Sequence, residues 1–178
     1  MRQIEGFSMT MPKIVVDGYN VIHASQELAA LLARDLEAAR QALLHRLAAY
    51  LNTHKVEIVV VFDGAEVHPS STGTALLPRL RLVFSHPPES GDAVIEKLLR
   101  ADAHPRSVTL VTADKQLAGV ARERGASVLS PSRFLHLVAK SRQADDLVDN
   151  KFNGEMSEAE LAEWLALFGE KTERSRRA

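Results

Sequence analysis

The sequence predicts an α/β fold in which helices cover both faces of a parallel sheet. Five short apolar runs alternate with longer segments of helical periodicity, and this alternation is typical of βαβ units. Several of the runs are continuous Val, Ile and Leu without polar alternation, as expected for strands buried on both faces. We therefore predict a three-layer α/β/α sandwich with a mainly parallel sheet.

The predicted elements follow one another in a regular order. The five strands cover residues 13–16, 57–62, 80–84, 108–111 and 126–129. Between the first two strands, residues 26–51 carry an apolar stripe at helical spacing, which predicts one helix or a pair. Further helical patterns span residues 92–102 and 115–124, with Gly125 as a stop for the second. Another short helix is expected to begin at Pro131.

The chain of 178 residues suits one globular domain with a small addition. Residues 1–11 hold three methionines and no clear period, so we expect an N-terminal extension outside the fold. Residues 12–140 contain the alternating pattern and are predicted to form the main domain. Residues 141–178 are predicted to be a helical appendage with a basic tail, because Ser157 and Glu160 form a capping box before an apolar stripe.

Composition excludes several classes of protein. The chain is 46% hydrophobic and 25% charged, which argues against general disorder, and its formal charge of −1 offers no overall basic coat for nucleic acid. It has no cysteine, which excludes disulfides and thiolate metal sites. No segment reaches membrane-spanning length or resembles a signal peptide, so a cytoplasmic protein is expected. No Gly-rich phosphate loop follows the first strand, so we expect no nucleotide cofactor.

Three of the five apolar runs end on or near an aspartate. Asp17 ends the first, Asp63 follows the second, and Asp114 comes shortly after the fourth. Ligands of open parallel sheets bind outside the carboxyl ends of the strands, so these carboxylates converge if their strands are neighbours. Asp92 and Glu96 lie four residues apart and share one face of a predicted helix.

A cluster of carboxylates needs a counter-charge. Two of them about 4 Å apart repel by roughly 4 kcal/mol at an effective dielectric of 20. Oxygen ligands without cysteine favour a hard cation, Mg²⁺ or Mn²⁺, and such ions hydrolyse phosphodiesters by activating water and stabilising the leaving 3′ oxygen. Asn20 is expected beside Asp17, where its amide would orient the carboxylate or contact a phosphate. The predicted catalytic residues are Asp17, Asn20, Asp92 and Asp114, and the predicted metal ligands are Asp17, Asp63, Asp92, Glu96 and Asp114.

Each acid also has a local structural explanation. Asp17 and Asp63 precede glycines and could form turns. Asp92 suits the first turn of a helix because of the helix dipole, Asp114 could cap the next helix, and Glu96 could be a solvated surface acid. The joint pattern favours a site for Asp17, Asp92 and Asp114, and leaves the two explanations balanced for the others.

Four motifs in order, "VVDGYNVI", "VVVFDG", "SGDAVIEKLL" and "VTADKQLAGVARERGASVLSPSRFL", resemble the NYN domain family and its YacP-like branch among the PIN-like nucleases. The resemblance covers roughly residues 13–140. It implies a Rossmann-like PIN fold, an acidic site that uses Mg²⁺ or Mn²⁺, and endoribonuclease activity on RNA.

The resemblance also implies roles for single positions. Asp17 and Asn20 fall on the first-strand acid and the asparagine after it, Asp92 on the helix acid, and Asp114 on the acid of the Thr-x-Asp motif. Asp63 falls on the second-strand acid, and Thr112 is the neighbour of Asp114. The chain departs from the family in one place, because Ser90-Gly91-Asp92 stands where Thr-Ala-Asp is expected.

Substrate binding requires positive charge near the acids. Arg79 and Arg81 close a long loop, and Lys115 lies beside Asp114, so we predict that they bind phosphates together with Thr112. The alternative is that each is an ordinary solubilising surface charge.

The leading hypothesis is a metal-dependent endoribonuclease whose RNA substrate is free or presented on the ribosome. The alternative is a non-catalytic RNA- or ribosome-associated binding module with a structural metal. A phosphatase of the dehalogenase type is disfavoured, because it requires an Asp-x-Asp pattern and Tyr19 occupies the second position.

Overall fold

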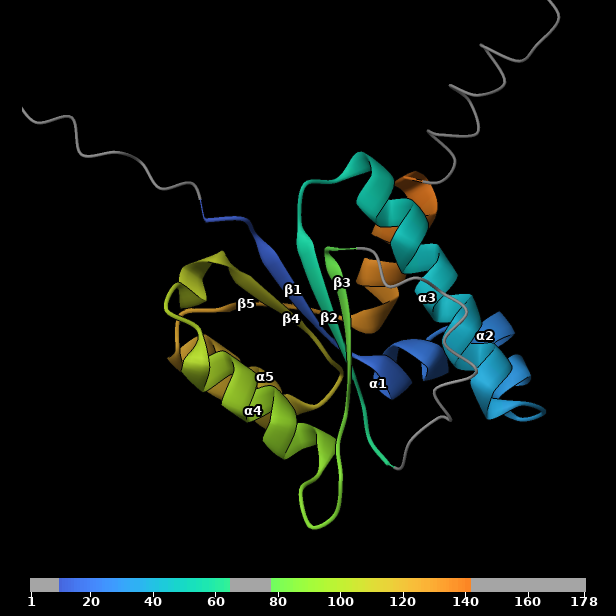
Figure 1. Cartoon of the computed structure of the whole chain (residues 1–178), viewed down its shortest axis with the longest axis horizontal. Coiled ribbons are helices and arrows are strands. Elements are labelled where there is room, and N and C mark those ends of the chain that lie inside the picture. The colour runs from blue at the N-terminus through green and yellow to red at the C-terminus, as the bar shows by residue number, and fades with distance from the viewer. Residues whose placement is uncertain (1–9, 65–77, 142–178) are drawn as a thin grey trace, which may run out of the picture. The chain divides into compact units, whose positions relative to one another are not determined.

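The computed structural model describes residues 10–64 and 78–141, which contain a five-stranded sheet with helices on both faces (Figure 1). The strands are β1 (Lys13–Asp17), β2 (Glu57–Phe62), β3 (Leu80–Phe84), β4 (Val108–Val111) and β5 (Ser127–Leu129). Their order in the sheet is β3-β2-β1-β4-β5, and every neighbouring pair is parallel. The predicted α/β sandwich with a parallel sheet is confirmed.

The strand order reverses beside β1. The chain passes from β1 to β2 on one side and later returns to β4 on the other, so the switch point of the sheet lies between β1 and β4. The register pairs Asp17 with Val61 and Val16 with Val111. Because all strands run in one direction, their carboxyl ends share one edge, and ligands of such sheets bind outside that edge at the switch point.

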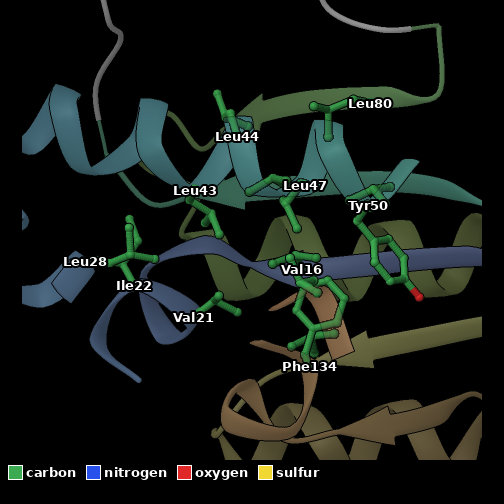
Figure 2. Packing of buried hydrophobic residues seen from close by; sticks show 14 of the residues in the cluster. Val16, Val21, Ile22, Leu28, Leu43, Leu44, Leu47, Tyr50, Leu80 and Phe134 are labelled. Carbon is green, nitrogen blue, oxygen red and sulfur yellow. The ribbon is translucent and has the colours of Figure 1, made fainter. Parts of the chain in front are cut away.

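One face of the sheet is covered by α1 (Gly18–His23), α2 (Gln26–Leu32), α3 (Leu36–Thr53) and a helix over residues 131–141. The segment predicted as one helix or a pair is thus two helices. Figure 2 shows the core on this face, where side chains of the helices meet the sheet. Its largest buried members include Ile22, Leu28, Leu43, Leu47, Leu51, Phe62 and Phe134.

The other face is covered by α4 (Gly91–Ala101) and α5 (Lys115–Glu123), with the short 3₁₀ helix η2 (Pro105–Ser107) between α4 and β4. Val15 packs into this second core, whereas Val16 packs into the first, and both are fully buried. The continuous apolar runs therefore have the predicted cause, since both faces of the strands are covered.

The predicted appendage over residues 141–178, apart from its first residue, and residues 1–9 of the predicted extension over residues 1–11 lie outside the described residues. The chain divides into two units, Met1–Arg142 and Gln143–Ala178, and every described residue belongs to the first. Among the described helices, none combines the length and the apolar character needed to cross a membrane.

A close backbone approach explains one glycine at the start of α1. A Cβ added at Gly18 would lie 2.3 Å from a ring carbon of Phe62, the last residue of β2. Gly18 thereby lets the helix begin directly after Asp17 while Phe62 keeps its buried place.

We expect Gly18→Ala to lower the free energy of unfolding by about 1–3 kcal/mol, the usual cost of overpacking a core. The control is Gly119→Ala inside α5, where an added Cβ meets nothing within 4 Å. That substitution should raise stability by about 0.5–1 kcal/mol through helix propensity. Urea denaturation followed by circular dichroism measures both, and equal effects would contradict the steric explanation.

Candidate active site

Asp17 is held in place by partners from two segments. It is the last residue of β1 and the N-cap of α1, where its Oδ1 accepts from the Asn20 N–H at 3.4 Å. The Asn20 side-chain amide and the Thr112 hydroxyl both donate to Oδ2, the latter at 3.2 Å. The structure thus places Asn20 beside Asp17, where it orients the carboxylate.

Thr112 links Asp17 to Asp114. Its side chain is buried, and its Oγ1 also accepts from the Asp114 N–H at 3.0 Å. Asp114 in turn caps α5, because its Oδ1 accepts from the Leu117 N–H at 2.8 Å. Thr112 therefore joins Asp17 to the turn that carries Asp114, across the switch point of the sheet.

Asp92 faces other acids from the first turn of α4, a helix capped by Ser90. Asp92 is exposed, but partial desolvation by the surrounding protein raises its pKa above 3.8, and the charges of Asp114, Asp63 and Glu96 raise it further. Burial likewise raises the pKa of Asp17, with a smaller contribution from the charge of Asp92. Asp92 therefore lies close enough to the other acids for like charges to disfavour its ionised form.

Asp63 lies at this edge too, and one oxygen of its exposed carboxylate accepts hydrogen bonds from two donors. Its Oδ1 accepts from the Ser85 hydroxyl and from the Gly91 N–H, the latter at 3.0 Å. The Ser85 hydrogen bond, followed by the Gly91 one, lowers the pKa of Asp63 below 3.8. Its charge is therefore stabilised by the protein itself.

Glu96 lies one turn beyond Asp92 on α4. Its Oε2 accepts from Arg100 Nη2 at 2.8 Å, in an ion pair on the surface of the helix. It contributes to the field at Asp92, but its own charge is already partly balanced by the arginine.

The chemistry of the donor set suits a hard divalent cation. Asp17, Asp92 and Asp114 supply only oxygen ligands. A bound cation would offset the free-energy cost of desolvation and repulsion that raises the pKa of Asp17 and Asp92. Across residues 10–64 and 78–141, however, no three acidic or histidine side chains already converge on one point as a ready metal-binding group. The acids are neighbours that would have to close around an ion.

The structure does not bring the two predicted phosphate-binding arginines to the acids. Arg79 precedes β3 at the amino edge, where its guanidinium donates to the carbonyls of Leu51 at 2.7 Å and His54 at 2.6 Å, at the end of α3. Arg81, the second residue of β3, lies 3.7 Å from Glu57 in an ion pair. Lys115, in contrast, is exposed directly after Asp114 at the carboxyl edge.

Sequence reasoning missed a buried arginine behind the acidic edge. Arg40 in α3 is only 4% exposed, and its Nε donates to the Tyr19 hydroxyl at 3.1 Å. Its guanidinium carbon lies 5.5 Å from the ring centroid of Tyr19, 5.3 Å from that of Phe62 and 5.1 Å from that of Phe84. We call these four residues the arginine cage.

The arginine cage adjoins the site along the chain. Tyr19 lies between Asp17 and Asn20, and the two phenylalanines directly precede Asp63 and Ser85. One sequence signal could have revealed it, because Arg40 stands three, four and seven residues before Leu43, Leu44 and Leu47 and so interrupts the buried face of α3.

Removing one charge from the acidic edge should stabilise the metal-free protein. Because the pKa of Asp92 is raised in the folded state, its ionised form costs stability above that raised pKa and costs nothing below the ordinary value of 3.8. In chelator near pH 7, Asp92→Asn should therefore have a higher free energy of unfolding than the parent chain, and the gain should vanish as the pH approaches 3.8. Urea titrations across this range test it, and a variant less stable at neutral pH would refute the repulsion.

Comparisons with known proteins agree with the family resemblance. The family model of the YacP-like NYN domain matches residues 14–173. A crystal structure of Rae1 (YacP) from Bacillus subtilis is similar with a TM-score of 0.70 and 26% identity, over 94% of this chain and 96% of that one. A crystal structure of a mutant of the same protein gives a TM-score of 0.68 at 26% identity, over 83% of this chain and 87% of that one. No curated protein matches the sequence.

Proposed function

Because the chain belongs to the YacP-like NYN domain family, we propose that it is a metal-dependent endoribonuclease with its reaction centre at the carboxyl edge of the sheet. The observation that carries the proposal is the gathering of Asp17, Asp92 and Asp114 from three separate segments beside the switch point. Two of these acids are joined through the single hydroxyl of Thr112. Carboxylates are oxygen ligands for the divalent cations that catalyse phosphodiester hydrolysis.

Asp17, Asp92 and Asp114 would hold Mg²⁺ or Mn²⁺, which supplies a more acidic water and a counter-charge for the leaving 3′ oxygen. The chain's own contribution is to keep these carboxylates oriented. Asn20 and Thr112 hold both oxygens of Asp17, and α5 begins on Asp114. Outer contacts of this kind are worth roughly 10–100-fold in metal affinity or activity.

The substrate would approach the exposed edge beside Lys115. Lys115 is exposed and directly follows Asp114 in the chain, which supports this role. Arg79 and Arg81 bind groups at the opposite edge and are left out of the proposal. The formal charge of −1 gives little general attraction for RNA. We therefore include in the proposal an RNA substrate that is presented by a partner such as the ribosome. We also propose that the protein acts in the cytoplasm.

One observation favours a second candidate function. Asp17 and Asp114 both cap helices, so their places in the fold have a structural reason without catalysis. A non-catalytic RNA-binding module with a structural ion would use the same residues in that way.

Labelled single-stranded RNA, incubated with Mn²⁺, Mg²⁺ or a chelator and with or without ribosomes, distinguishes the two. We expect metal-dependent cuts that leave a 5′ phosphate and a 3′ hydroxyl. The double variant Asp17→Asn, Asp114→Asn should retain RNA binding but lose more than about 100-fold in cleavage rate. Loss of a residue that only orients a metal ligand costs roughly 10–100-fold, and loss of two ligands should cost more.

Asp102→Asn is the matched control for the loss of a carboxylate. Asp102 pairs with Lys13 at the opposite end of the sheet, so the variant should cleave like the parent chain. Products with a 2′,3′-cyclic phosphate would exclude attack by water. RNA binding without cleavage in any condition would favour the binding module.

A further inference from the structure

The carboxylate of Asp63 is hydrogen-bonded to the start of α4, the helix that carries Asp92. Its Oδ1 accepts two hydrogen bonds from distant parts of the chain, the Ser85 hydroxyl after β3 and the Gly91 N–H at the start of α4. Ser85 is only 1% exposed, and its Oγ also accepts from the Gly64 N–H at 3.1 Å. One carboxylate oxygen therefore joins the ends of β2 and β3 to the beginning of α4.

The contact with α4 lies one residue from Asp92. Gly91 is the first residue of the helix, and an added Cβ there would lie only 3.1 Å from the Cβ of Asp63. The departure from the Thr-Ala-Asp pattern thus has a structural counterpart, because glycine lets the helix start lie close against the carboxylate. A negative charge at a helix N-terminus is also stabilised by the helix dipole.

From these contacts we propose that Asp63 is a positioning residue, which anchors the start of α4 and so sets the place of Asp92, and that it does not bind the metal. This inference rests on the proposed nuclease function. Donors already balance the charge of Asp63 and lower its pKa, whereas partial desolvation and neighbouring acids raise that of Asp92. The ionised form of Asp63 is already stabilised by hydrogen bonds within the protein, whereas that of Asp92 still lacks a counter-charge.

Two substitutions separate anchoring from ligation. Asp63→Asn keeps an oxygen that can accept from Ser85 and Gly91 but removes the charge that a metal ligand needs, whereas Asp63→Ala removes both. We expect the Asn variant to keep kcat/KM within about threefold and the same Mn²⁺ concentration for half-maximal cleavage. The Ala variant should lose about 10–100-fold in kcat/KM, because small displacements of a reacting group are that costly.

Amide hydrogen exchange, measured by NMR without metal, gives a readout that does not need cleavage. The Gly91 N–H should exchange about tenfold faster in Asp63→Ala than in the parent chain, because it loses a charged acceptor, and should stay protected in Asp63→Asn. If Asp63→Ala fails to fold, Asp63→Leu takes its place, since it also removes the acceptor of the Gly91 N–H while keeping a side chain of larger volume.

Either of two outcomes would overturn the inference. Equal losses in the Asn and Ala variants, with a raised Mn²⁺ requirement in the Asn variant, would make Asp63 a metal ligand. Unchanged Gly91 exchange in the Ala variant would show that no anchor exists. If the parent chain cleaves no RNA, the nuclease proposal fails separately, and the exchange experiment still decides whether Asp63 holds α4.

Discussion

Repulsion among carboxylates is the constraint that organises this protein. Parallel strands place Asp17 and Asp114 at one edge, and α4 adds Asp92 to it. The N-termini of α1, α4 and α5 all begin at these residues or beside them, so the partial positive charges of helix ends offset part of the negative charge. The same topology that concentrates the acids therefore also supplies the dipoles that let the fold tolerate them.

Structural and functional explanations of these acids turn out to be compatible. Asp17 and Asp114 are helix caps, as the local reasoning allowed, and they also lie within an acidic edge, as the joint pattern predicted. In a helix cap, one carboxylate oxygen accepts a hydrogen bond from a backbone N–H. This bond fixes the side chain, as a metal ligand requires. Local turn chemistry therefore cannot by itself decide whether such an aspartate is functional.

The sequence predicted the five strands and the acidic edge because both depend on local patterns: apolar runs, and the residue at which each run stops. It misplaced Arg79 and Arg81 relative to the acids, since a loop that leads into a parallel strand must end at the amino edge. The arginine cage was missed for another reason. Its rings come from α1, β2 and β3, and only the folded arrangement of these segments shows why an arginine can replace an apolar residue in α3.

The arginine cage restricts how this region can change. A planar guanidinium that contacts three rings and a hydroxyl has no equivalent in lysine, whose compact ammonium cannot stack on them. Changes at Arg40, Tyr19, Phe62 and Phe84 are therefore expected to be strongly non-additive, as for residues that share one network. Substitutions in the arginine cage should therefore be tolerated only in combination, and its four residues would have to change together.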